Sequence, residues 1–123
     1  MVIITQRRAK KPRMTKQLTV SKVFATPKMG ENETNPEIFT RLDFVQYEGE
    51  QILDRVSVGD FEGFTLANLP EQIKKIIELT DGGTPVKIEA TYYQSAFVSK
   101  KTGAPGIANR SSLSDLNSWK IVE

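Results

Sequence analysis

One stretch of the chain alternates aromatic and basic side chains in a way that could bind an anion carrying flat rings. Phe39, Arg41 and Tyr47 share a side of residues 37–47 if that segment is extended, because strand side chains alternate between two faces. Arg55 would point outward from the following segment. An exposed ring beside a guanidinium can stack on a base while the cation binds phosphate. The pattern indicates a surface for a single strand of nucleic acid; a subunit interface or a second, smaller core is the alternative.

A second group of the same kind lies in the C-terminal half. Lys87, Tyr93 and Phe97 share one face of residues 85–98 if these form a strand. The residues that follow, 99–112, contain Gly and Pro and are predicted to form a long loop. That loop adds three cations, which are Lys100, Lys101 and Arg110.

Positive charge is concentrated at the N-terminus. Residues 5–16 hold six basic side chains and no acidic one, although the whole chain has 17 basic and 15 acidic residues. We expect residues 1–16 to form a flexible arm and residues 17–123 a single domain. The arm and the start of the domain would contact phosphates without sequence preference through Arg7, Arg8, Lys10, Lys11, Arg13 and Lys22. A merely solvated arm is the alternative.

The composition argues against catalysis. The chain contains no Cys and no His, which excludes disulfides, thiolate metal sites and the commonest general base. A metal-dependent nuclease could use carboxylates alone, and the candidates are Asp43, Glu48, Asp54, Asp60 and Glu62. The one tight pair, Asp60 and Glu62, falls in a predicted glycine-rich turn, where acidic residues are common for conformational reasons. We therefore expect a protein without enzymatic activity, cofactor or bound metal.

The hydrophobic pattern predicts a small set of elements. Strands are expected at 17–25, 37–47, 51–58, 85–98 and 117–122, with a short one at 2–5. The connection 26–36 has loop composition, and 48–50 reads as a hairpin turn. Asn68 and Glu71 fit a capping box that opens a helix ending near Asp81. That helix is expected only to pack on the sheet.

Several aromatic residues are expected in the core rather than at a binding surface. Phe44 lies on the apolar side of its strand, and Phe24 and Tyr92 fit the same role. Phe61 and Phe64 are expected to pack beneath the helix. Trp119, in the last predicted strand, is expected in the core or an interface.

The order of elements predicts a mainly β fold: a five-stranded, OB-fold-like antiparallel barrel with one α-helix between strands three and four. SH3-like barrels and small α+β domains share parts of this order. In an OB-fold, oligonucleotides bind over strands two and three, beside the 1–2 and 4–5 loops. Residues 26–36 and 99–112 would be those loops here.

Within this order, the segment KIEATYYQSAFV (87–98) and the basic Gly/Pro loop after it resemble the single-stranded DNA-binding proteins of tailed bacteriophages. The resemblance covers roughly residues 17–122. It implies an OB-fold that coats single-stranded DNA in replication or recombination, works as a homodimer or homotetramer, and meets phage replication or recombination proteins in the host cytoplasm. One departure is the C-terminal SSLSDLNSWKIVE, which is not the acidic tail by which bacterial members recruit partners.

Other readings stay open at this point. No apolar stretch approaches the ~20 residues of a membrane span, and the opening MVIIT is too short for a secretory signal, so we expect a soluble, intracellular protein.

The main alternative function is an oligomeric structural or interaction domain, such as a virion component, that uses its aromatic face for protein contacts. An RNA-binding barrel would differ from the first reading only in its ligand.

Overall fold

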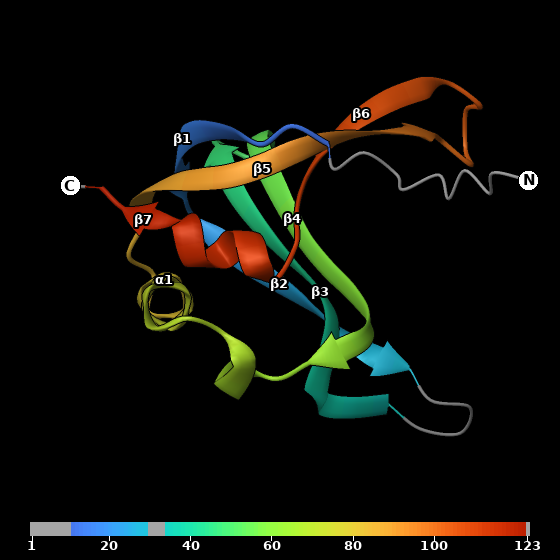
Figure 1. Cartoon of the computed structure of the whole chain (residues 1–123). Coiled ribbons are helices and arrows are strands. Elements are labelled where there is room, and N and C mark those ends of the chain that lie inside the picture. The colour runs from blue at the N-terminus through green and yellow to red at the C-terminus, as the bar shows by residue number, and fades with distance from the viewer. Residues whose placement is uncertain (1–10, 30–33, 123) are drawn as a thin grey trace, which may run out of the picture.

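The computed structural model describes residues 11–29 and 34–122. Among these residues strands dominate, and a single α-helix lies between the fourth and fifth strands (Figure 1). In chain order the elements are β1 (Met14–Val20), β2 (Lys22–Met29), β3 (Thr34–Glu48), β4 (Gln51–Phe64), η1 (Leu66–Asn68), α1 (Glu71–Asp81), β5 (Val86–Val98), β6 (Pro105–Ser111), η2 (Ser114–Ser118) and β7 (Lys120–Ile121).

All the strands belong to one curled sheet, in the order β1-β5-β6-β4-β3-β2, with β7 paired to β5. Strands β4 and β6 run parallel, and every other pair is antiparallel. β1 and β2 stand at opposite ends of this order, yet only Ser21 separates them in the chain. The chain itself therefore joins the two ends, and the sheet curls into a barrel-like shape.

The prediction of a mainly β fold with one α-helix is confirmed, but the count of five strands is wrong, and the helix follows the fourth strand instead of the third. The described residues form seven strands. The single strand expected at 17–25 is divided at Ser21, because its two halves pair with different partners, β5 and β3. The backbone N–H of Ser21 donates to the carbonyl of Val45 at 2.8 Å, which holds the break against β3.

The break at Ser21 also reverses which side chains face the core. Leu18 and Val20 point inward from β1, whereas Val23 packs against the core from β2. Phe24, expected in the core by uninterrupted alternation, is instead 39% exposed. Side chains alternate between the two faces of a strand only while its backbone stays regularly extended. One irregular residue therefore exchanges the inward and outward positions of all residues after it.

Segment boundaries differ from expectation mainly near Gly and Pro. Residues 26–29 and 34–36 extend β2 and β3 instead of forming a loop, and 105–111, predicted as loop, form β6. The final strand shrinks to two residues behind the 3₁₀ turn η2. β6 (PGIANRS) has weak strand propensity, and it is the pairing with β5 that holds it extended. The strand expected at 2–5 lies outside the described residues.

The helix packs on the sheet as predicted, but its N-cap is Pro70 instead of Asn68, so it begins two residues later than expected. Asn68 closes the preceding 3₁₀ turn, where its Oδ1 accepts a hydrogen bond from the backbone N–H of Thr65 at 2.9 Å. Pro70 then occupies the N-cap position, and its fixed φ of −60° suits a helix start. Ile73 and Ile76 are fully buried on the inner side of α1.

The core is centred on an aromatic pair. Phe44 of β3 meets Trp119 edge-on, with ring centroids 4.8 Å apart. The indole Nε1 of Trp119 donates to the backbone carbonyl of Thr91 at 2.9 Å, so its one polar atom is satisfied. Phe64 is also buried, and Tyr92 packs at the core's edge, as expected. The side chain of Phe61 lies outside the described side chains.

Gly63 in β4 has a conformation that other residues adopt only under strain. Its φ is +89°, and a Cβ there would lie 2.6 Å from Cγ2 of Ile38. Gly63→Ala is therefore expected to lower the free energy of unfolding by about 1–3 kcal/mol in urea denaturation. Gly82→Ala is the matched control, because Gly82 has a φ of −77° and its nearest contact would be an ordinary 3.5 Å. Equal losses in the two variants would contradict this account.

Candidate nucleic-acid interface

A row of polar and aromatic side chains crosses five strands on the outer face of the sheet. The register pairs Phe24 with Asp43, Asp43 with Ser57, Ser57 with Arg110, and Arg110 with Tyr93. Sequence neighbours of the row residues point the other way, into the core. Examples are Val23 beside Phe24 and Phe44 beside Asp43. Residues far apart in the chain therefore lie side by side on one surface.

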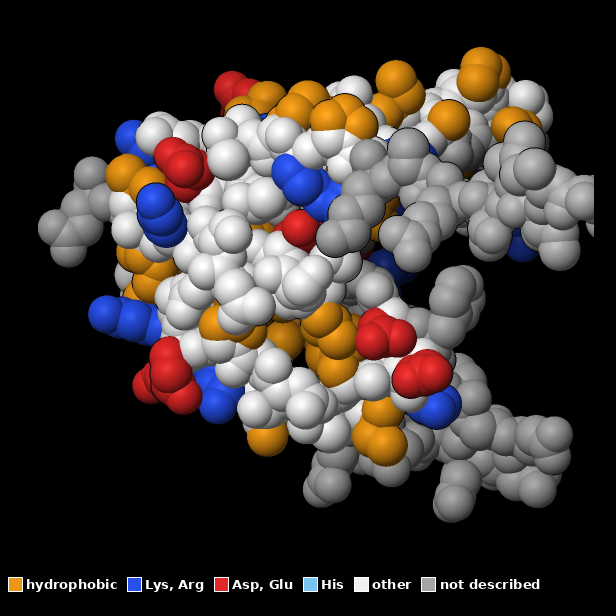
Figure 2. All heavy atoms as spheres, in the orientation of Figure 1, with side chains coloured by type: hydrophobic (Ala, Val, Ile, Leu, Met, Phe, Trp, Pro, Cys, Tyr) orange, Lys and Arg blue, Asp and Glu red, His pale blue; other side chains and the backbone are white. Residues whose placement is uncertain are grey.

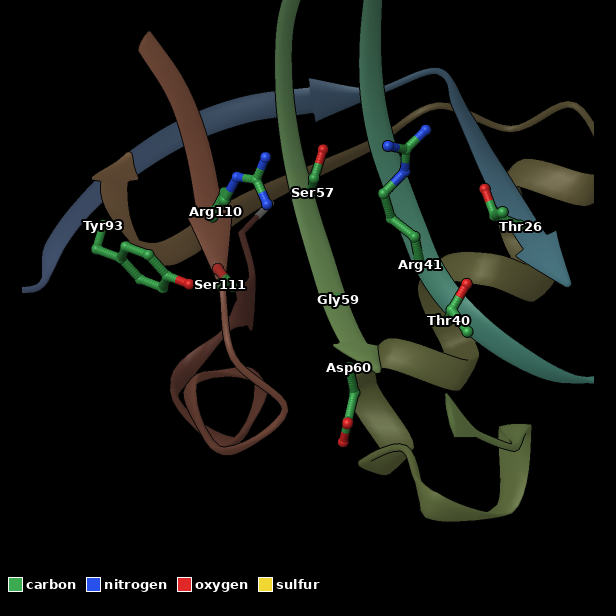
Figure 3. Close-up of a pocket in the computed structure, with 9 residues that line it drawn as sticks. All are labelled: Thr26, Thr40, Arg41, Ser57, Gly59, Asp60, Tyr93, Arg110 and Ser111. Carbon is green, nitrogen blue, oxygen red and sulfur yellow. The ribbon is translucent and has the colours of Figure 1, made fainter. Parts of the chain in front are cut away.

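An open groove of about 480 Å³ lies over the part of this row formed by Ser57, Arg110 and Tyr93. Figure 3 shows Ser57 of β4 between Arg110 of β6 and Arg41 of β3, with Tyr93 at one end and Thr26 at the other. Gly59 leaves part of the floor without a side chain. We call this feature the cross-strand groove; its lining is Thr26, Thr40, Arg41, Ser57, Gly59, Asp60, Tyr93, Arg110 and Ser111.

Two arginines give the cross-strand groove its positive charge, but they are not equivalent. Arg41 donates from Nε to the carboxylate of Asp43 at 3.0 Å, and Asp43 also accepts from the hydroxyl of Ser57. Asp43 is only 6% exposed, so a buried charge requires these partners. Arg110 is exposed and forms no ion pair with a carboxylate of the described residues. Its guanidinium is the one that can bind an anion without losing an ion pair.

The residues just before β1 reach the Tyr93 end of the groove. The guanidinium carbon of Arg13 lies 4.4 Å from the centroid of the Tyr93 ring, and Nζ of Lys11 lies 5.8 Å from it. Arg13 also forms an ion pair with Asp115 of η2. Two of the basic residues expected to contact phosphate therefore lie beside a predicted stacking residue.

Other predicted residues lie around a second hollow, next to the first. It measures about 390 Å³ and is lined by Arg55 and Phe97 together with exposed apolar residues. The Phe97 ring lies over Gly106, where an added Cβ would come within 2.5 Å of it. We call this the apolar groove; its lining is Ile52, Leu53, Asp54, Arg55, Ser57, Phe97, Ile107, Ala108 and Asn109.

The structure contradicts the outward placement of Phe39. A register shift lies between Phe39 and Arg41, and it turns Phe39 toward the core. Its ring lies 6.4 Å from that of Phe64, centroid to centroid. A β-bulge reorients one side chain in this way without changing the strand's hydrophobic pattern, so the sequence carried no sign of it.

The remaining predicted residues do not gather at the cross-strand groove. Tyr47 is half-buried near the end of β3, and its backbone N–H donates to Oγ of Ser21. Lys87 lies six residues from Tyr93 along β5, roughly 20 Å away. Lys100 and Lys101 are exposed in the turn after β5, and Lys22 lies over the ring of Phe24 at 5.1 Å. Arg7, Arg8 and Lys10 lie outside the described residues.

Several lining residues were not predicted, because only the pairing of strands reveals them. Ser57 and Gly59 carry no sequence signal of their own. Phe24 was expected in the core, yet it stands in the outer row. Arg55 was expected to point outward, and two-residue alternation from it places Ser57 on the same face, which was the only available hint.

The acidic candidates for metal chemistry are dispersed. Asp60 and Glu62 lie in β4, not in a turn, and Oδ1 of Asp60 accepts a hydrogen bond from the backbone N–H of Glu62 at 3.0 Å. Within residues 11–29 and 34–122, no group of three or more acidic side chains is arranged to hold a metal ion. In the same part of the chain, no helix has the length and hydrophobicity needed to cross a bilayer.

Comparison with known proteins identifies no relative: no family model, curated protein or solved structure matches this chain.

Proposed function

We propose that this protein binds single-stranded DNA with little sequence preference and without catalysis. The observation that carries the proposal is the cross-strand groove, where the exposed Arg110 and the ring of Tyr93 are direct neighbours. A single strand offers phosphates and unstacked base faces side by side. A guanidinium binds the phosphate and a ring stacks on the base, and every base has such a face.

The arrangement of strands supports an OB-like barrel as the frame for this site. If β1 and β2 are the two halves of one broken strand and β7 is an addition, five strands remain, with α1 between the third and the fourth. Strands two and three of that barrel are β3 and β4. These strands supply Arg41, Ser57 and Gly59, so the groove lies over the face on which OB-folds bind oligonucleotides.

The geometry favours a single strand over a duplex. In a duplex the base faces are stacked on one another and closed to a protein ring, so Tyr93 would have no partner. A duplex would still attract the cations through its phosphates, but without stacking.

The resemblance to phage single-stranded DNA-binding proteins favours DNA over RNA and a role in replication or recombination, in the cytoplasm of a host cell.

Arg110→Ala is expected to weaken oligo(dT) binding about three- to tenfold, because one charge-assisted phosphate contact is lost. It should also reduce the slope of log affinity against log salt concentration by about 0.7, the value for one contact to a single strand. Fluorescence anisotropy measures both quantities. Lys75→Ala, on the exposed side of α1, removes the same charge away from the groove and should change neither. Equal effects of the two substitutions would remove Arg110 from the site.

A second candidate, an interaction domain, is favoured by the apolar groove. Ile107 is 67% exposed, and Leu53 and Phe97 are exposed beside it. Figure 2 shows apolar side chains along the hairpin of β5 and β6, where it extends beyond the body of the molecule. β6 pairs with β4 only at Arg110 and Ser111, so its earlier edge, from Pro105 to Ala108, is open toward β4 and carries no charge.

We propose that a second copy of the chain occupies this edge. Two identical uncharged edges can pair antiparallel across a two-fold axis, which buries the apolar residues of both copies. Ile107→Asp is expected to convert a dimer to a monomer in light scattering, since two carboxylates would face each other there. Leu66→Asp, at an exposed position on η1 outside this groove, is the control. A wild-type monomer at high concentration, or an Ile107→Asp dimer, would overturn the assignment.

A further inference from the structure

Arg13 is held in place by more than the ring of Tyr93. Its Nε donates to both carboxylate oxygens of Asp115, at 2.9 and 3.0 Å, and its Nη1 donates to the backbone carbonyl of Lys11 at 2.8 Å. Lys11 in turn donates from Nζ to the backbone carbonyl of Gln94 at 3.3 Å. The guanidinium is thus fixed over one face of Tyr93 by a carboxylate, a carbonyl and a ring.

Hydrogen bonds from Ser112 hold the carboxylate of Asp115 in position for Arg13. The backbone N–H and the hydroxyl of Ser112 both donate to its Oδ2, at 2.8 and 2.9 Å. The Asp115 side chain is 11% exposed and that of Arg13 is 32% exposed, so the pair is partly shielded from water. An ion pair with a pre-positioned carboxylate and little exposure is more persistent than one between two free surface chains.

The charge on Asp115 is secure at neutral pH. Burial pushes the pKa of Asp115 upward, but hydrogen bonds from Ser112 and Arg13 and the positive charge of Arg13 outweigh it, so the pKa lies below its ordinary value of 3.8. Because the pKa of Asp115 is lowered, its carboxylate stays charged at neutral pH. The ion pair with Arg13 is lost only when the pH falls through that lowered pKa. Near neutral pH, protonation of Asp115 therefore does not release Arg13, whereas a competing anion can.

We propose that Arg13, Asp115 and Tyr93 form a latch that covers the stacking face of Tyr93 in the free protein and opens when a single strand binds. This inference rests on the proposed function. To open the latch, a ligand must replace two contacts at once: a phosphate must take Arg13 from Asp115, and a base must take its place on Tyr93. Duplex DNA and inorganic polyphosphate offer the phosphate but no open base face. The latch weakens the binding of every polyanion, because each must displace Arg13 from Asp115. Only a single strand offsets this loss, by stacking a base on Tyr93, so the latch favours single strands.

Asp115→Asn tests the latch, because the amide keeps an oxygen for Ser112 and loses the charge that holds Arg13. Asp81→Asn, at the exposed end of α1, is the control for net charge. The first readout needs no nucleic acid. Trypsin cleavage of the Arg13–Met14 bond, followed by mass spectrometry, should be about threefold faster or more in Asp115→Asn, because the bond is released from a held segment. The Lys11–Pro12 bond resists trypsin and does not interfere.

The second readout is binding, measured by anisotropy with oligo(dT), duplex DNA and polyphosphate. Asp115→Asn should bind each ligand about three- to tenfold more tightly than Asp81→Asn, with the larger gain for duplex and polyphosphate, so that selectivity for the single strand falls. If Asp115→Asn fails to fold, Arg13→Gln replaces it, read by the NMR signals of the Tyr93 ring. Those signals should move on substitution, and in wild type they should move in the same direction when oligo(dT) is added.

The outcomes separate the two proposals. If oligo(dT) binds wild type but Asp115→Asn matches Asp81→Asn in cleavage and in affinity, the latch is wrong and the proposed function stands. If oligo(dT) binds wild type but leaves the NMR signals of the Tyr93 ring unmoved, Arg13 stays on Tyr93 in the complex and the latch is again wrong. If no variant binds oligo(dT), the proposed function and the latch fall together.

Discussion

Phe44→Ala is expected to lower the free energy of unfolding by about 3–5 kcal/mol, the range for removing a buried phenyl ring. Phe44 is 0% exposed and stands edge-on to Trp119 at the centre of the core. Its removal leaves a cavity that the surrounding strands cannot fill, because β3 is paired on both sides, to β2 and β4. Urea denaturation followed by the fluorescence of Trp119, the single tryptophan, gives the value directly.

Phe24→Ala is the matched control for this prediction. Phe24 and Phe44 lie on adjacent strands, but Phe24 faces outward and retains 39% of its exposure. The same chemical change there should cost about 1–2 kcal/mol, clearly less than at Phe44, because a ring that is 39% exposed loses less buried surface and leaves no enclosed cavity. Similar losses for the two substitutions would mean that the break at Ser21 does not reverse the faces of β2 as described.

Tyr93→Ala is expected to weaken oligo(dT) binding roughly 5- to 150-fold, which corresponds to about 1–3 kcal/mol for one stacked base. The loss should appear for every homopolymer, because a ring stacks on any base. Tyr93 is half-buried on the outer face, so the thermal midpoint should fall far less than in Phe44→Ala. Anisotropy and thermal denaturation on the same sample separate the two effects.

Two further variants define what Tyr93 does. Tyr93→Phe keeps the ring and should bind nearly as wild type does, which separates stacking from any role of the hydroxyl. Leu66→Ala removes an exposed apolar side chain from η1, outside the groove, and should leave binding unchanged. Unchanged affinity in Tyr93→Ala would remove the stacking site from the cross-strand groove.

The parts of the fold that follow from local pattern were predictable from the sequence. Leu42 and Phe44, then Val56 and Val58, alternate with polar residues, and all four are buried. The isoleucine stripe of α1 is equally local. Burial of such positions requires only that each element turn its apolar side to a common core, whichever strands become neighbours.

The features that were predicted wrongly have a common cause: each depends on pairing between segments that are distant in the sequence. The break at Ser21 exists because one stretch of chain serves two partners. β6 is extended because β5 lies beside it, although its own residues favour a loop. The bulge after Phe39 reflects the fit of β3 to β4. No property of these residues alone reports such contacts.

The candidate site divides in the same way. Arg41 and Tyr93 were predicted from residue type and alternation, and Arg110 as a cation of a loop. Their adjacency depends on the pairing of β6 with both β5 and β4. Asp115 was not predicted at all, because its partner Arg13 lies 102 residues earlier in the chain. A sequence can therefore nominate the chemistry of a surface while the sheet register decides which residues act together.

The most direct test of the central claim is anisotropy of a labelled oligo(dT), titrated with wild-type protein at several salt concentrations, with an equally long duplex as competitor. The account predicts binding to the single strand, weak competition by the duplex, and a salt slope of about −0.7 for each phosphate contact. Absence of binding at low salt, or equal competition by the duplex, would contradict it.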